Sequence, residues 1–68
     1  MNLSIGTVVN NNDHGYEMKV VRETKKSYIF HVDYFCDFVD EQITVDQTVS
    51  KTKVQKYLTV TNQWSLKN

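Results

Sequence analysis

The sequence lacks the residues from which a small protein builds covalent or metal cross-links. Its 68 residues include one cysteine, Cys36, which excludes an internal disulfide, and no Cys and His cluster offers the ligands of a structural zinc site. A chain of this length forms one domain and buries only about 60% of the surface that its unfolded form exposes. We therefore expect residues 1–68 to form one small domain that is held together by packing alone and uses no cofactor.

Long hydrophobic segments are absent as well. The first residues, Met-Asn-Leu-Ser-Ile, carry no positively charged side chain and begin no apolar run of signal-peptide length. No later stretch approaches the roughly 20 apolar residues of a transmembrane helix. We expect a cytoplasmic protein without a membrane partner.

The net charge is +0, but the charges are distributed unevenly. Residues 33–46 contain five acidic residues and no Lys or Arg, whereas residues 47–68 contain four lysines and no acidic residue. A balanced total disfavours a sequence-independent nucleic-acid binder of the ordinary basic kind. The simplest interpretation of both segments is a solvated surface that keeps a small protein soluble.

The composition carries a bias that points to origin. Phe, Tyr, Met, Ile, Asn and Lys, which have AT-rich codons, number 25, whereas Gly, Ala, Arg and Pro together number 3. We infer an AT-rich gene. Such a short, biased gene suits a low-GC bacterium, and more particularly a phage or mobile element of one.

Alternation of apolar and polar residues at period two predicts strands. The clearest pair is residues 16–23 and 28–34, which the polar segment 24–27 joins as a hairpin. Residues 3–9 predict a first strand that ends in a loop at 10–15, and residues 43–49 predict a fourth strand. The segment 35–42 fits a strand end or a bulge, with the next turn at Asp40 and Glu41.

A short helix is predicted between the fourth strand and the last. Ser50 suits an N-cap, and Val54, Tyr57 and Leu58 then fall on one helical face. Residues 58–64 alternate again and predict a last strand before a frayed tail at 65–68. Four strands, a helical turn and a fifth strand resemble the order of SH3-like small barrels. We predict a mainly β fold, either a five-stranded antiparallel SH3-like barrel or a strongly bent open sheet, with one helical turn before the last strand.

Catalytic motifs are missing: there is no Gly-rich phosphate loop, no G-x-S-x-G elbow and no H-E-x-x-H pair. Cys36 has His14 and His31 as conceivable bases, but a lone cysteine is far more often a small apolar residue than a nucleophile. His31, Asp33 and Asp37 are conceivable metal ligands, yet an ordered site needs three or four convergent ligands with supporting hydrogen bonds. We expect neither an enzyme nor a metal site.

The first candidate binding site is acidic and aromatic. It comprises Phe35, Asp37, Phe38, Asp40 and Glu41. An exposed Phe35 or Phe38 would give the aromatic anchor that protein interfaces favour, and the carboxylates would steer a basic partner. The alternative is a loop whose aromatic side chains fold inward. An open sheet edge at this place would also allow a homodimer through strand pairing.

The second candidate site is basic and aromatic. It comprises Lys51, Lys53, Lys56 and Trp64. Aromatic faces stack on bases, at about 1 to 3 kcal/mol each, while lysines follow the phosphates. The alternative is that the eight aromatic residues are needed to fill the core.

The leading functional hypothesis is a non-catalytic protein-binding module. On this hypothesis the chain is a phage or mobile-element accessory protein that modulates a host or phage protein by occupying its surface. The alternative is an SH3-like nucleic-acid-binding protein, whose affinity would fall steeply with added salt. The partner itself is not identified by the sequence.

Overall fold

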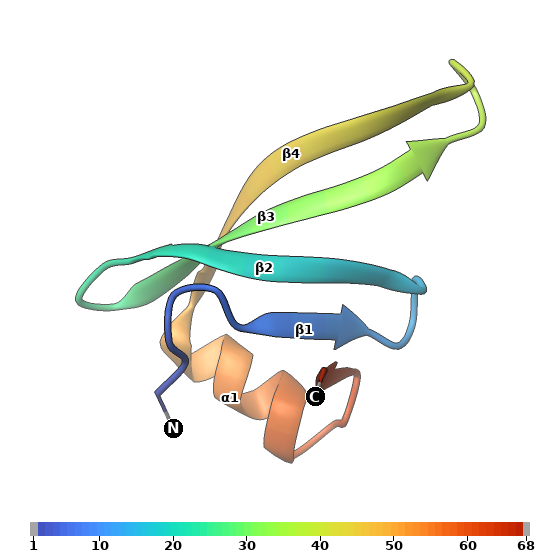
Figure 1. Ribbon diagram of the computed structural model, residues 1–68. Helices are drawn as coiled ribbons and strands as arrows, with labels where there is room; N and C mark the ends of the chain where they lie inside the picture. The colour runs from blue at the N-terminus through green and yellow to red at the C-terminus, as the bar shows by residue number, and fades with distance from the viewer. Residues whose placement is uncertain (1, 68) are drawn as a thin grey trace.

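Five antiparallel strands and one helix make up the fold, seen in a computed structural model that describes residues 2–67 (Figure 1). The mainly β fold with one short helix before the last strand is therefore confirmed. The elements in chain order are β1 (Val8–Asn11), β2 (Tyr16–Glu23), β3 (Ser27–Cys36), β4 (Glu41–Ser50), α1 (Lys51–Thr59) and β5 (Trp64–Leu66).

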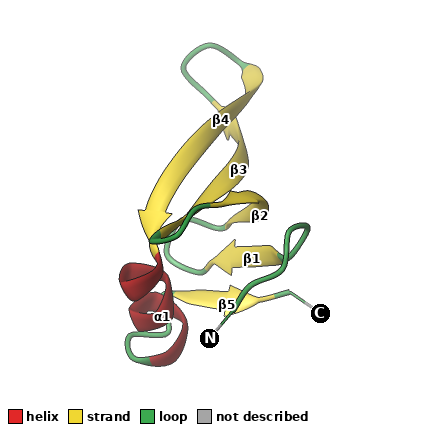
Figure 2. Ribbon diagram, turned by 90° about the vertical axis from the view of Figure 1, so that its left-hand side faces the viewer, coloured by secondary structure: helices red, strands yellow, loops and turns green. Residues whose placement is uncertain are grey.

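The strands form one sheet in the order β4-β3-β2-β1-β5, and every neighbouring pair is antiparallel. Strands β4 and β5 lie at the two ends of this order, and within residues 2–67 they do not pair with each other. The sheet is open and bent, with α1 beside its β5 end (Figure 2). The closed barrel is therefore not confirmed.

The β2–β3 hairpin supplies half of the buried apolar residues, as the alternation predicts. Met18 and Val20 of β2 and Tyr28, Phe30 and Val32 of β3 are all buried. Thr24 closes the turn, because its backbone N–H donates to the Ser27 carbonyl (2.8 Å) and its side-chain oxygen accepts from the Ser27 N–H (3.0 Å).

The remaining core residues come from every other part of the fold. Trp64 of β5 packs edge-on against Phe30, with ring centroids 5.5 Å apart, and lies 4.9 Å from the ring of Tyr57 on α1. The other buried apolar residues are Leu3, Val9, Val49 and Val54.

The first strand begins later than the predicted residues 3–9, and this part of the prediction is wrong. Gly6 has a φ of +96°, a backbone conformation that an extended strand does not contain. Strand β1 starts after it, at Val8, and runs on into Asn11. The Asn11 side chain is buried and its carbonyl oxygen accepts from the N–H groups of Asp13 and His14, so it shapes the turn that follows.

Ser50 caps α1 as predicted: its side-chain oxygen accepts from the Lys53 N–H at 3.2 Å. The predicted last strand at 58–64 is wrong, because the chain stays helical through Thr59. Val60 and Thr61 then donate to the Lys56 carbonyl, and Asn62 takes a left-handed φ of +56° that reverses the chain. The strand begins only at Trp64 and includes Ser65 and Leu66, which the sequence placed in a frayed tail; Asn68 lies outside the described residues.

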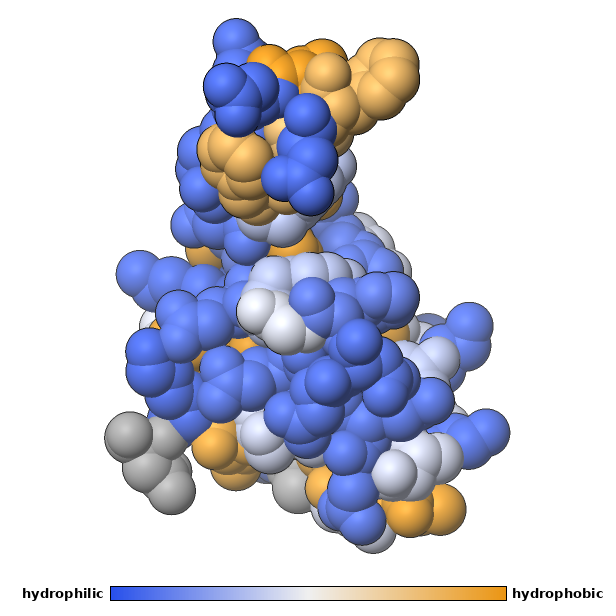
Figure 3. Space-filling view, turned by 90° about the vertical axis from the view of Figure 1, so that its right-hand side faces the viewer, coloured by the Kyte–Doolittle hydropathy of each residue, from blue (hydrophilic) through white to orange (hydrophobic). Residues whose placement is uncertain are grey.

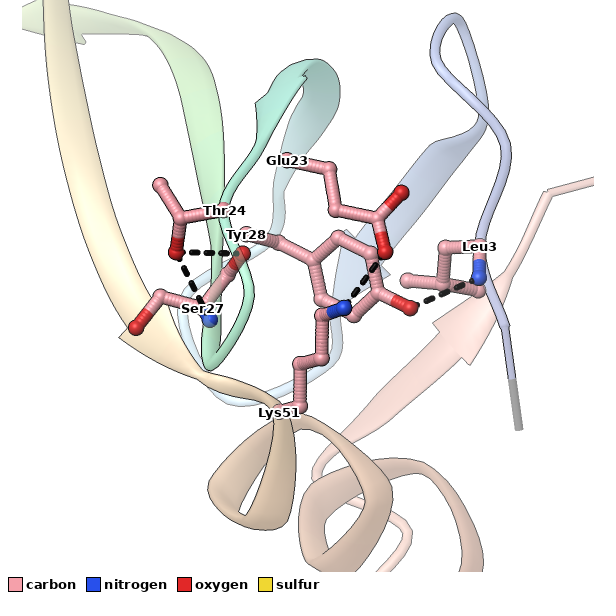
Figure 4. A network of polar contacts seen from close by, with 6 residues as sticks. All are labelled: Leu3, Glu23, Thr24, Ser27, Tyr28 and Lys51. Atoms are coloured by element: carbon pink, nitrogen blue, oxygen red, sulfur yellow. Dashed lines mark hydrogen bonds and ion pairs between the residues drawn. The ribbon is translucent and has the colours of Figure 1, made fainter.

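A polar network ties the N-terminal segment, the β2–β3 hairpin and α1 together (Figure 4). The Tyr28 hydroxyl accepts from the Leu3 N–H at 3.0 Å in a buried position. The Lys51 ammonium lies 5.2 Å from the centre of the Tyr28 ring and forms an ion pair with Glu23. The Tyr28 side chain of β3 thus contacts both the N-terminal segment and α1, which are distant from each other in sequence.

We predict that Tyr28→Phe lowers the free energy of unfolding by about 1 to 3 kcal/mol, because the buried Leu3 N–H loses its acceptor. Tyr34→Phe, which removes an exposed hydroxyl, is the matched control and should change it by less than about 0.5 kcal/mol. Urea denaturation measures both. Equal values for the two variants would contradict the structural role of the Tyr28 hydroxyl.

Candidate protein-binding site on the projecting hairpin

The end of the β3–β4 hairpin projects beyond the rest of the sheet (Figures 1 and 2). The backbone pairing of β2 with β3 extends as far as Met18 opposite Val32, whereas the pairing of β3 with β4 continues to Cys36 opposite Glu41. We call residues 33–45 the arm. It narrows to a two-stranded ribbon beyond Tyr34, because β2 begins at Tyr16 and has no residue opposite Phe35 or Cys36.

The tip of the arm is a four-residue turn, residues 37–40, between Cys36 and Glu41. Asp40 has a left-handed φ of +54°, which Asp tolerates better than most residues. This turn carries Phe38, which is 96% exposed, and Phe35 is 55% exposed on the strand before it. The aromatic side chains therefore do not fold inward.

Hydrophobic side chains gather at this end of the molecule. Figure 3 shows them over the arm, at the top of the view, among hydrophilic neighbours. Residues Tyr34, Phe35, Phe38, Val39 and Val45 of the arm are all exposed. This apolar surface adds Tyr34, Val39 and Val45 to the residues of the predicted site.

The two faces of the arm differ. Strand alternation and the β3–β4 register place Tyr34, Ile43 and Val45 on the same face as the buried Phe30 and Val32. This face is an extension of the core with no element of residues 2–67 packed over its outer part. The opposite face carries Phe35 and Gln42, together with Asp33 and Thr44.

Carboxylates surround the apolar surface. All five acidic residues of 33–46 are exposed, and this segment contains no Lys or Arg. Asp33 accepts a hydrogen bond from the Thr44 hydroxyl, and the Asp46 carboxylate lies 3.0 Å from His31 Nδ1. The predicted residues Asp37, Asp40 and Glu41 thus lie beside Phe35 and Phe38 at one exposed end of the fold.

An aromatic row that sequence reasoning missed adjoins the base of the arm. His14 stacks on Tyr16 with ring centroids 5.7 Å apart, and Tyr16 lies 6.4 Å from Tyr34. A hollow of about 450 Å³ is lined by these three residues and by Phe35, among others. The only sign of this aromatic row in the sequence is Tyr16, which follows a polar loop.

The second candidate site does not form a stacking platform. Trp64 is 7% exposed, since its indole packs between Phe30 and Tyr57, and it is not available to a base. Lys51 is half-buried and paired with Glu23. Lys53 and Lys56 remain exposed on α1. The burial of Trp64 corrects the part of the prediction that requires an accessible aromatic face.

Within residues 2–67, no group of three or more His, Cys, Asp and Glu side chains is arranged to hold a metal ion. Cys36 is half-buried as a free thiol. None of the helical segments in the described part of the chain is both long and apolar enough to cross a membrane.

Comparison with known proteins gives no relative from which to transfer a role. No family model, curated protein sequence or solved structure matches this chain.

We predict that Phe38→Ala changes the free energy of unfolding by less than about 0.5 kcal/mol, because the side chain makes almost no contact with the fold. Phe30→Ala, which empties a fully buried site, should cost about 3 to 5 kcal/mol. Urea denaturation of both variants tests the difference. A large loss for Phe38→Ala would place that side chain in the core.

Proposed function

We propose that this chain is a non-catalytic protein-binding module that contacts a basic partner protein through the end of the arm. The observation that carries the proposal is Phe38, which is 96% exposed at the tip of a projecting hairpin and flanked by Asp37 and Asp40. The role of the module is to occupy the surface of its partner and so modulate it.

The energetics of the tip favour association. Burial of a fully exposed Phe side chain contributes about 1.5 to 3 kcal/mol, and Phe38 gains none of this within its own fold. Phe35 and Val39 add apolar area beside it. Aromatic anchors of this kind, at the centre of a patch, supply much of the binding energy of protein interfaces.

The charges of the arm favour a basic partner. The five carboxylates of residues 33–46 have no Lys or Arg within the same segment, so they form a field of one sign. Such a field attracts a cationic surface over about 8 Å at physiological ionic strength and raises the rate of association.

We further infer that the fold is an open relative of SH3-like barrels and that the gene belongs to a phage or mobile element of a low-GC bacterium. The first inference is supported by four antiparallel strands, one helix and a fifth strand in that order. The second is supported by the AT-rich codon bias of the composition. The proposed site of action is the host cytoplasm.

Capture of a partner from lysate of a low-GC bacterial host tests the proposal. Tagged wild-type protein should retain one protein at near-stoichiometric amounts with and without nuclease treatment, and Phe38→Ala and Asp40→Asn should each lower its recovery at least about fivefold. Asparagine is chosen at position 40 because it removes the charge and still accepts the left-handed backbone.

The matched control is Val60→Ala. Val60 is also exposed, at 71%, but follows α1 far from the arm in the fold. If Val60→Ala lowers recovery as much as Phe38→Ala, the arm is not the binding site. If the recovered proteins are many and vanish after nuclease treatment, nucleic acid is the ligand and the lysines of α1 become the site.

A further inference from the structure

The outer edge of β4 pairs with no other strand in the described part of the chain, residues 2–67. Strand β4 is last in the strand order, and Figure 1 shows no ribbon beyond it on the side away from β3. It is ten residues long and pairs with β3 without a register shift. Proteins commonly protect an edge with Pro, charged side chains, a bulge or a very short strand. Of these devices β4 has only charge, from Glu41 and Asp46, and both of these side chains are acidic.

The hydrogen bonds of β4 identify the residues whose backbone groups point outward. The Lys51 N–H donates to the Lys26 carbonyl at 2.8 Å, so the opposed Ser27 and Ser50 form a non-hydrogen-bonded pair. The pairs alternate along an antiparallel ladder, which makes Val49, Gln47, Val45, Ile43 and Glu41 the residues bonded to β3. The backbone N–H and C=O groups of Gln42, Thr44, Asp46 and Thr48 therefore point away from the sheet.

We propose that the partner adds an extended segment to this edge as a sixth strand, with apolar and basic residues in alternation. The inference deepens the proposed function and depends on it. An added strand would form hydrogen bonds with the outward backbone groups of Gln42, Thr44, Asp46 and Thr48, and these four residues are all exposed.

The two faces of the arm determine which kinds of side chain should alternate along the added strand. Residues of an added strand that lie opposite Ile43 and Val45 share their face, where the exposed Tyr34 extends the apolar surface. Residues opposite Thr44 and Asp46 share the face that carries Asp33. Apolar side chains match the first face and cationic side chains match the second.

Charge also distinguishes this occupant from a second copy of the chain. A copy paired through its own β4 would bring the Glu41 and Asp46 carboxylates of the second chain to an edge that already carries its own Glu41 and Asp46, with three further carboxylates of residues 33–40 nearby in each copy. Like charges placed close together across a sheet are destabilising. A basic strand gains from the same charges.

Space for the segment continues toward the helix. A hollow of about 280 Å³ lies beside the C-terminal half of β4 and is lined by Gln47 and Thr48, by Lys53 and Tyr57 of α1, and by Trp64. The added strand can therefore extend along β4 from the arm toward α1.

Backbone amide exchange followed by NMR tests the proposal, with the blocked peptide acetyl-Lys-Val-Lys-Val-Lys-Val-Lys-amide as the probe. The peptide should slow exchange at Gln42, Thr44, Asp46 and Thr48 at least about tenfold. The amides of Ile43, Val45 and Gln47, already bonded to β3, should change little. The peptide with Glu in place of Lys should have no effect up to millimolar concentration.

Thr44→Pro and Thr44→Ala separate backbone pairing from side-chain contact. Both lose the hydroxyl that donates to Asp33, but only Pro removes the outward N–H, which an edge strand tolerates. Thr44→Pro should weaken peptide binding at least about tenfold relative to Thr44→Ala. Asp46→Lys provides a second test that leaves the backbone unchanged: it should weaken the Lys peptide and allow the Glu peptide to bind.

The outcomes that overturn the proposal are distinct. No protection at millimolar Lys peptide, or equal binding by Thr44→Pro and Thr44→Ala, removes strand addition. Protection of the outward amides that rises with protein concentration in the absence of peptide would show that a second copy occupies the edge. If the lysate partner is lost with Phe38→Ala but retained by both Thr44 variants, the proposed function stands and strand addition falls.

Discussion

The unequal lengths of the two partners of β3 determine the rest of the structure. Strand β3 pairs with β4 along all ten of its residues, but its backbone pairing with β2 stops at Val32. Up to that point the sheet is broad enough to bury Phe30 and Val32 under Trp64 and α1. Beyond it, the same alternation continues on a ribbon too narrow to cover its own apolar side chains.

The core and the arm are thus two parts of one surface that differ in what covers them. Tyr28 and Tyr34 lie on the same face of the same strand, yet Tyr28 is buried by the chain around it and Tyr34 is exposed. In so small a protein, apolar residues placed outside the core contribute little to its stability. These exposed apolar residues are the feature on which the proposed association depends.

Local patterns in the sequence predicted most of the strands and the helix, whereas features that depend on contacts between distant segments could not be predicted. Alternation located β2 and β3, and Ser50 marked the start of α1. The alternation wrongly predicted a strand at Leu58 and Val60. Apolar residues two apart fit a strand, but Val54 and Leu58 also fit one face of a helix, and the chain forms the helix. Crowding of apolar residues left both exposure and inward folding of Phe35 and Phe38 open, and only the fold shows that both are exposed. The burial of Trp64 depends on contacts with Phe30 and Tyr57, which no short segment encodes.

Ser50 is both the last residue of β4 and the N-cap of α1. No linker residue separates the two elements. The next residue, Lys51, is held by a hydrogen bond from its backbone N–H to the Lys26 carbonyl and by its ion pair with Glu23. The position of β4 therefore fixes where α1 starts, because no residue between the two elements can take up a displacement of one relative to the other.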